Sequence, residues 1–279
     1  MTGAVLSLDD LQRLSDFLYR HTGMLFGETK RYYIERRVDD RMSSTGSPNF
    51  ASYFNMLRVD SAEREALINA FTVNETYFYR EEHQLACLSR SLLPDLITTR
   101  RPGDKIRIWS APCSTGEEAY SIAIWLLENW RMVDAYNVEI VASDIDTRVL
   151  EAARAGFYGE RALQRLPQAL RQSYFEPAKR HRWRIIEDLR ESVTFTPANL
   201  IDGQSLVGQG QFDVIFCRNV LIYFDDASRL TAAHNLHDRL APGGYLCLGH
   251  TESMNRITDR FVARRFEDAI VYQRPERPS

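Results

Sequence analysis

The sequence has little cysteine, no large excess of charge and no long apolar run. Its cysteines are Cys87, Cys113, Cys217 and Cys247; they form no CxxC pair, and their spacing suits no zinc site. We expect them to be small buried residues in a reducing compartment. The formal net charge of −3 argues against a nucleic-acid partner, which usually requires a strongly basic face.

Membrane and export signals are also missing from the sequence. No apolar run approaches the roughly 18 residues that span a bilayer. Residues 1–10 lack the basic start and the apolar core of a signal peptide. The sequence therefore predicts a cytoplasmic protein with no direct membrane insertion.

Metal and nucleophile signatures are weak as well. His234 and His237 lie three apart on a predicted helix, but no carboxylate ligand is placed beside them, so we expect no metal. Cys113 has no nearby histidine to serve as its base, which argues against a nucleophilic cysteine. The 279 residues, 44% hydrophobic and 26% charged, have an ordinary globular composition.

Residues 1–72 predict an all-helical domain. Ser7 and Asp10 have capping-box spacing, apolar residues then recur at helical intervals, and Gly23 is a plausible stop. Three further helices are expected: one over Glu28–Ser43, one opened by Pro48 and one capped by Ser61.

Residues 106–279 have a different pattern, which follows a linker segment and helix at 73–105. Short apolar runs at 106–111, 138–143, 212–217, 245–249 and 269–274 alternate with helical patterns near 116–130, 147–155 and 226–240. Nearly continuous apolar strands that alternate with helices predict an α/β fold with a mostly parallel sheet. Residues 157–197 interrupt the alternation, and we expect them to form an insertion with a small antiparallel element that includes the runs WRII and SVTF.

The loop after the first predicted strand reads SAPCSTGEEAYS (110–121). Small residues and Gly116 allow a tight turn near a ligand, and the following helix offers free backbone N–H groups. The loop is not GxGxxG, and Glu117 and Glu118 would repel a phosphate. A phosphate-free cation such as S-adenosylmethionine fits better, although a capped helix start would also explain the two acidic residues.

Polar residues follow two other predicted strands. Asp144 could accept hydrogen bonds from ribose hydroxyls or could cap the next helix, a role that Asp146 could take instead. Arg218 and Asn219 are costly to place at a strand end unless something pairs with them. Tyr223 could point into a cleft or pack in the core.

The linker VNETYFYR (73–80) offers a third set of polar side chains. In an extended chain, residues two apart point the same way. Asn74, Thr76 and Arg80 could therefore face one cleft, with Tyr77 and Tyr79 on the other side. A polar connecting loop would have the same composition.

Together these segments resemble the CheR family of chemotaxis-receptor methyltransferases. The matching pieces, in order over about residues 70–253, are NETYFYR, IRIWSAPCSTGEEAYSIAI, VASDIDTRVLEAARAGFY, FDVIFCRNVLIYFD and PGGYLCLGHTES. The resemblance implies a class I, Rossmann-like S-adenosylmethionine-dependent methyltransferase domain after an all-helical domain. It implies methylation of glutamate side chains of chemoreceptors, with S-adenosylhomocysteine as product and no metal.

The resemblance also implies site residues. Cofactor contacts are expected at Asn74, Thr76, Arg80, Glu118, Asp144, Asn199, Leu200, Arg218 and Asn219. Arg80 and Tyr223 match family residues near the transferring methyl group and are the expected catalytic residues.

The implied partner is the cytoplasmic helical bundle of a chemoreceptor, which has acidic faces. Arg36, Arg37 and Arg41 could steer such a bundle, but acidic residues interleave with them, so a solvated mixed face is equally consistent. Some family members dock on a receptor tail through a Gly-containing β-hairpin loop. Here 176–184 reads EPAKRHRWR, without glycine and strongly basic, which predicts independence of such a tail.

Two other functions agree with parts of the sequence. The sheet motifs alone would also suit a small-molecule methyltransferase, whereas the helical domain and NETYFYR favour a protein substrate. A non-catalytic S-adenosylmethionine-binding regulator would not need Arg80, Asp144 and Tyr223 together.

Overall fold

The N-terminal helices begin and end where side chains satisfy their free backbone groups. In the computed structural model, which describes residues 6–26 and 30–276, the Ser7 side chain accepts a hydrogen bond from the Asp10 N–H at the start of α1 (Leu8–Thr22). Gly23 ends α1 in the left-handed conformation, with φ 71°. The Ser7 cap and the Gly23 stop are therefore confirmed, with the Asp10 carboxylate accepting from the Ser7 hydroxyl.

The other helices of this domain are α2 (Arg31–Thr45), α3 (Phe50–Val59) and α4 (Ser61–Phe71). The expected start of the second helix at Glu28 lies outside the described residues. Asp60, not Ser61, caps α4, because its carboxylate accepts hydrogen bonds from the N–H groups of Ala62 and Glu63. The four helices enclose their own apolar core, which includes Leu14, Ile34 and Leu67.

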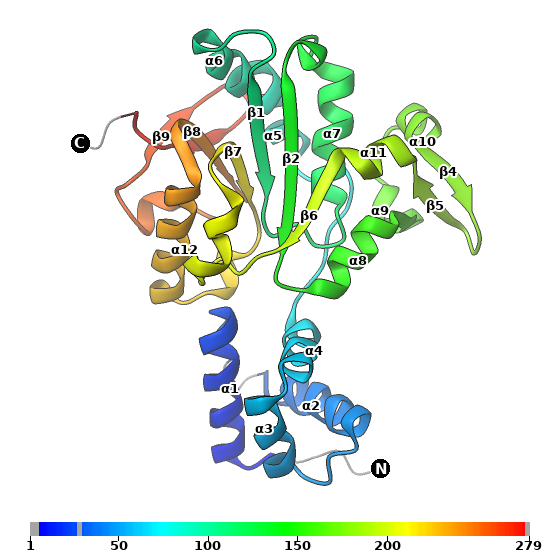
Figure 1. Cartoon of the computed structure of the whole chain (residues 1–279), viewed down its shortest axis with the longest axis vertical. Coiled ribbons are helices and arrows are strands. Elements are labelled where there is room, and N and C mark those ends of the chain that lie inside the picture. The colour runs from blue at the N-terminus through cyan, green and yellow to red at the C-terminus, as the bar shows by residue number, and fades with distance from the viewer. Residues whose placement is uncertain (1–5, 27–29, 277–279) are drawn as a thin grey trace.

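The second domain is built on a seven-stranded sheet with the order β6-β2-β1-β7-β8-β10-β9 (Figure 1). The first five strands in this order pair in parallel, whereas β10 is antiparallel to both β8 and β9. The strands are β1 (Lys105–Ser110), β2 (Asn137–Asp144), β6 (Val193–Pro197), β7 (Phe212–Cys217), β8 (Leu240–Leu248), β9 (Val262–Arg265) and β10 (Ile270–Gln273). The mostly parallel α/β sheet is confirmed.

Helices cover both faces of this sheet, and the strand residues alternate between two cores. Val214 and Phe216 belong to one cluster, whereas Ile215 and Cys217 belong to the other. The helical elements of the domain are α5 (Glu82–Cys87), the π-helix η2 (Leu88–Leu92), α6 (Leu93–Leu96), α7 (Glu117–Asn129), α8 (Thr147–Ala155), α12 (Asp226–Arg239) and the short turns η3 (Ile97–Thr99), η4 (Val133–Ala135), η5 (Gly203–Gln209), η6 (Leu221–Tyr223) and η7 (Met254–Arg256).

The insertion is smaller than the sequence suggested. A three-stranded antiparallel sheet with the order β3-β5-β4 is present as expected. Its elements are β3 (Phe157–Gly159), α9 (Glu160–Leu163), α10 (Gln168–Tyr174), β4 (Phe175–Ala178), β5 (Arg182–Ile185) and α11 (Glu187–Ser192). The assignment of SVTF to this element was wrong. Its last three residues, 193–195, begin β6, which pairs in parallel with β2 in the main sheet, where Val193 and Phe195 are buried.

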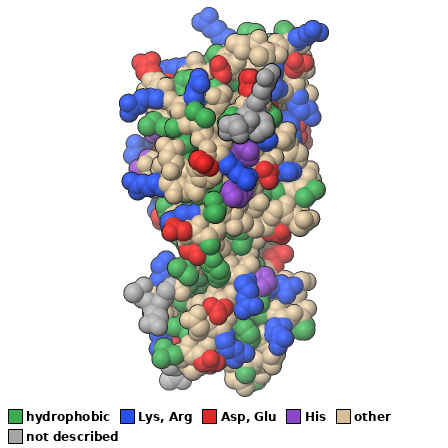
Figure 2. Space-filling model, turned by 90° about the vertical axis from the view of Figure 1, so that its left-hand side faces the viewer, with side chains coloured by type: hydrophobic (Ala, Val, Ile, Leu, Met, Phe, Trp, Pro, Cys, Tyr) green, Lys and Arg blue, Asp and Glu red, His purple; other side chains and the backbone are tan. Residues whose placement is uncertain are grey.

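The two domains meet at the carboxyl ends of the parallel strands. Met24 forms an antiparallel bridge with Phe224, and the Leu25 N–H donates to the Tyr223 carbonyl at 3.2 Å. Figure 2 shows hydrophobic side chains gathered at the waist between the domains. Within the described part of the chain, no helix combines the length and the apolar character that crossing a bilayer requires.

Candidate functional site

The loop between β1 and α7 turns tightly and lies close to its neighbours. Ser114 and Gly116 both have positive φ, 48° and 94°. A Cβ on Gly116 would lie 2.9 Å from the Ala153 Cβ, so only glycine fits there without a shift. The predicted tight turn is therefore confirmed, and it brings the Ser114 backbone to the end of β2.

Asp144 is buried at the carboxyl end of β2. Its carboxylate accepts hydrogen bonds from the N–H groups of Ser114, at 2.8 Å, and Asp146, at 3.0 Å. Burial raises its pKa from 3.8 to about 6, although these hydrogen bonds favour the charged form. Asp146 caps α8 by accepting from the Arg148 N–H, as the sequence allowed. Asp144 is thus left to face the cavity described below.

Arg218 lies buried between two carboxylates. Its guanidinium is 2.8 Å from a Glu118 oxygen and 3.2 Å from a Glu81 oxygen, and it donates to the Arg80 carbonyl at 2.8 Å. Burial raises the pKa of Glu118, against the effect of Arg218. Glu81 was not among the predicted site residues. Its position directly after NETYFYR was the only sequence signal for it.

The linker before α5 is not a regular extended segment. Tyr79 and Glu81 on either side of Arg80 have φ values of 59° and 56°. Asn74 lines the larger of two adjoining cavities, and Thr76 and Arg80 line the smaller one. Tyr77 lines that smaller cavity with them, so its expected position on the opposite side was wrong. The turn at 78–81 breaks the two-residue alternation.

Strained backbone gathers around these cavities. The described chain has six non-glycine residues with positive φ, and Ser114, Asn219, Tyr79 and Glu81 lie at or beside the cavity walls. Such conformations persist only where surrounding contacts hold them, and they cluster at functional sites. The backbone geometry therefore marks the same place as the sequence motifs.

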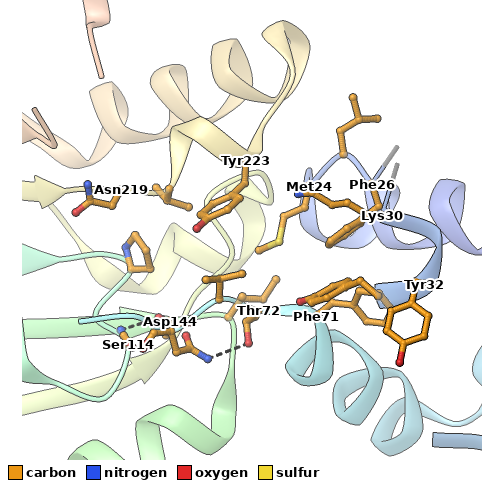
Figure 3. A pocket seen from close by; sticks show the side chains of 17 residues that line it. Met24, Phe26, Lys30, Tyr32, Phe71, Thr72, Ser114, Asp144, Asn219 and Tyr223 are labelled. Atoms are coloured by element: carbon orange, nitrogen blue, oxygen red, sulfur yellow. Dashed lines mark hydrogen bonds between the residues drawn. The ribbon is translucent and has the colours of Figure 1, made fainter. Parts of the chain in front are cut away.

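The larger cavity, of about 430 Å³, lies between the two domains. In Figure 3 the Tyr223 side chain extends into it between Asn219 and the aromatic side chains of the helical domain. Its helical-domain wall, which the sequence reasoning missed, is largely apolar and aromatic and contains Met24, Leu25, Phe26, Tyr32, Tyr33 and Phe71. The smaller cavity, of about 60 Å³, shares Val73, Pro112, Ser114 and Asn219 with the larger one. The two form a continuous crevice at the strand ends.

A third cavity, of about 30 Å³, adjoins this crevice at Asp144. Asn199 and Leu200 line it. The Asn199 amide also donates to the His21 carbonyl at the end of α1, at 2.8 Å, so this residue ties the two domains together.

Tyr223, the last residue of η6, is partly buried. Burial raises the pKa of its hydroxyl, and the charge of Arg80 opposes that shift. The two expected catalytic side chains are therefore electrostatic neighbours at one crevice.

Arg36, Arg37 and Arg41, the three α2 arginines expected to steer the partner, do not form a common surface. Arg41 makes two hydrogen bonds to the buried Glu63 carboxylate, and Arg37 donates to the Ala70 carbonyl and stacks on the Tyr33 ring at 3.6 Å. Arg36 is exposed. The expected steering role therefore suits Arg36 best, because a buried carboxylate requires the charge of Arg41.

The crevice has the chemistry that S-adenosylmethionine would need. Asp144 offers a carboxylate for the ribose hydroxyls. Arg80 and Arg218 offer positive charge for the carboxylate of the cofactor's amino-acid end, and Glu118 offers negative charge for its ammonium group. The Arg218 Nε is buried without a hydrogen-bond partner among the described residues, so a donor is left for a ligand. The apolar wall can cover a nucleoside. The residues present fit the group.

Known proteins share the sequence of this chain over most of its length. Residues 9–72 match the family described as "CheR methyltransferase, all-alpha domain", and residues 74–270 match "CheR methyltransferase, SAM binding domain". Chemotaxis protein methyltransferase 2 of Vibrio cholerae is 43% identical, with 99% of this chain and 96% of that protein covered. The chemotaxis protein methyltransferase of Escherichia coli K12 is 36% identical, with 93% and 90% covered.

Proposed function

This chain belongs to the CheR methyltransferase family, and from that membership we propose that it methylates glutamate side chains of chemoreceptors with S-adenosylmethionine. The observation that carries the proposal is the crevice at the strand ends, where Asp144, Arg80 and Tyr223 line adjoining cavities next to an apolar wall from the helical domain. The product would be a glutamate methyl ester.

The proposed chemistry asks little acid–base work of the protein. A glutamate carboxylate with an ordinary pKa near 4.3 is already an anionic nucleophile at neutral pH. S-adenosylmethionine supplies a methyl group that its sulfonium has activated. The protein then has to align the acceptor oxygen with that methyl group and exclude water. The reaction therefore needs no general base, and no histidine is among the described residues that line the crevice.

The residues would share this work. Asp144 would accept hydrogen bonds from ribose hydroxyls, while Arg218 and Glu118 would hold the amino-acid end. Asn74, Thr76, Asn199, Leu200 and Asn219 would complete the cofactor contacts. Tyr223 would orient the acceptor carboxylate by a hydrogen bond, and Arg80 would hold it or the nearby cofactor end without a tight ion pair, because tight pairing would weaken the nucleophile.

The proposed partner is the cytoplasmic helical bundle of a chemoreceptor, which places the enzyme in the cytoplasm. We expect no dependence on a receptor tail. The hairpin turn between β4 and β5 has left-handed Arg180 and His181, with φ 61° and 54°, instead of glycine, and basic side chains crowd it. This supports methylation without a tail contact.

The test is transfer of labelled methyl from S-adenosylmethionine to receptor-containing membranes. We expect label in the receptor that mild alkali releases as methanol, since base hydrolyses a carboxyl methyl ester. The variant Arg80→Ala should lose most of this transfer. Label found only in small molecules would favour a small-molecule methyltransferase, and cofactor binding without any turnover would favour a regulator.

A further inference from the structure

One carboxylate outside the crevice holds the backbone of the segment that follows β7. The Glu252 Oε1 accepts hydrogen bonds from the N–H groups of Val220, at 3.0 Å, and Leu221, at 2.8 Å. Its Oε2 accepts from the N–H groups of Asn219, at 2.7 Å, and Gly249, at 2.9 Å. A single side chain thus joins the loops after two neighbouring parallel strands.

The shape of the segment explains why it needs an anion. Asn219 has a left-handed φ of 61°, Val220 has φ −122° and ψ −37°, and η6 follows. Successive N–H groups in such a turn converge on a concavity that binds anions. The start of η6 also presents N–H groups without helical partners. Glu252 fills this concavity from within the same chain.

The held segment carries three of the residues assigned to the crevice. Arg218 pairs with Glu118, Asn219 lines both main cavities, and Tyr223 extends into the larger one. Glu252 lines neither cavity but faces an outer groove of about 530 Å³ beside α12. Glu252 therefore acts on the crevice without lining it, through the segment that it holds and, more weakly, through its charge, which adds to the raised pKa of Tyr223.

Gly249 shows how closely these groups pack. A Cβ at this position would lie 2.7 Å from the Asn219 Nδ2 and 2.8 Å from the Glu252 Oε2. Gly249 is not among the glycines with positive φ. Glycine is therefore required for space rather than for backbone conformation, and a methyl group there would push against the carboxylate.

We propose that Glu252 is a positioning residue for methyl transfer: its carboxylate fixes the backbone from Asn219 to Leu221 and thereby aims Arg218, Asn219 and Tyr223. The transfer part of this inference rests on the proposed function. The claim that Glu252 fixes the backbone of 219–221 is independent of the proposed function, because backbone hydrogen bonds can be measured without a receptor.

The main test compares Glu252→Gln with the matched control Glu191→Gln, which changes an exposed glutamate on α11. The amide keeps one oxygen acceptor but turns a donor toward the N–H groups. We expect amide exchange at 219–221 and 249 to accelerate at least about tenfold in Glu252→Gln, with the rest of the protein unchanged. We expect kcat to fall about 10- to 100-fold, with the receptor KM unchanged and the Kd for S-adenosylhomocysteine raised no more than about fivefold. The control should match the wild type in all four measurements.

A second variant, Gly249→Ala, disturbs the same carboxylate without changing its charge and should give the same pattern in milder form. Wild-type kcat or unchanged amide exchange at 219–221 in Glu252→Gln would overturn the proposal. Unfolding of both variants would overturn it too, in favour of a purely structural role. If the wild type transfers no methyl to receptors, the proposed function fails, while amide exchange still tests the hold on the segment.

Discussion

At the scale of single residues, Asp144 combines deep burial with a charge that the proposed function requires. Its folded pKa of about 6 lies above its ordinary value of 3.8, chiefly because of burial. A carboxyl group with a raised folded pKa contributes most to stability when it is protonated, below the unfolded pKa. That contribution is lost as the pH rises through the folded pKa.

This sign gives a prediction for Asp144→Asn, which cannot ionise. Between pH 4 and pH 7.5, the free energy of unfolding of the wild type should fall by about 2 kcal/mol relative to that of the variant. The reason is that only the wild type has to ionise a buried group over that range. Urea unfolding of both proteins without ligand, at several pH values, measures the difference. A difference that stays constant with pH would show that the Asp144 pKa is not raised.

Tyr223 is expected to serve catalysis rather than cofactor binding. Tyr223→Phe removes one orienting hydroxyl, so kcat should fall about 10- to 100-fold, while the affinity for S-adenosylhomocysteine should stay within about twofold. Initial rates and calorimetry measure the two quantities. Tyr174→Phe serves as the control, because that hydroxyl bonds Glu128 outside the crevice. Equal rates for Tyr223→Phe and the wild type would remove the catalytic role.

Single residues also show what the sequence could predict about the site. Strand-end motifs located Asp144, Glu118 and Arg218 because parallel strands place their carboxyl ends at one edge. The contacts of Glu252 and the aromatic helical-domain wall could not be predicted, since they join residues far apart in the sequence. The site roles themselves stay predictions until they are measured.

At the scale of elements, short-range signals predicted the helices well and the strands less well. Capping at Ser7 and Gly23 is local and was read directly. The run SVTF (192–195) was assigned to the wrong sheet because strand pairing is not encoded locally. The edge strand β9 was missed because all four of its residues are exposed, which leaves no alternation to detect.

The ion pair between α2 and α4 predicts a stability effect. Arg41 pairs with Glu63, which is 6% exposed and also accepts from the Tyr53 hydroxyl at 2.7 Å. Arg41→Ala would leave this buried carboxylate without its cation, so we expect a loss of about 2–4 kcal/mol of stability. Arg36→Ala, an exposed residue on the same helix, should change stability by less than about 0.5 kcal/mol. Denaturant unfolding distinguishes them, and similar small losses in both would contradict this account.

At the scale of the whole molecule, the crevice exists because two domains meet at the strand ends. The helical domain is held there by the Met24–Phe224 bridge and by hydrogen bonds from Tyr19 to Asp225 and from Asn199 to His21. The sequence predicted both domains, but not that Met24, Leu25, Phe26, Lys30, Tyr32 and Tyr33 line the cavity. That arrangement depends on long-range contacts, which no local pattern records.

The basic hairpin leads to a prediction about the whole enzyme–receptor complex. Since the 176–184 loop lacks glycine and is strongly basic, we expect a receptor shortened at its C-terminal tail to be methylated at the same rate, within about twofold, as the intact receptor. Parallel transfer assays at limiting receptor concentration provide the measurement. A large rise in KM for the shortened receptor would show that this enzyme uses the tail.

The central claim is that the strand-end crevice binds S-adenosylmethionine between the sheet and the helical domain. A crystal structure of the complex with S-adenosylhomocysteine tests it most directly. We expect the ribose hydroxyls within hydrogen-bond distance of the Asp144 carboxylate and the amino-acid end beside Arg80 and Arg218. A ligand bound elsewhere, or one in the crevice with Asp144 and Arg80 turned away from it, would contradict the claim.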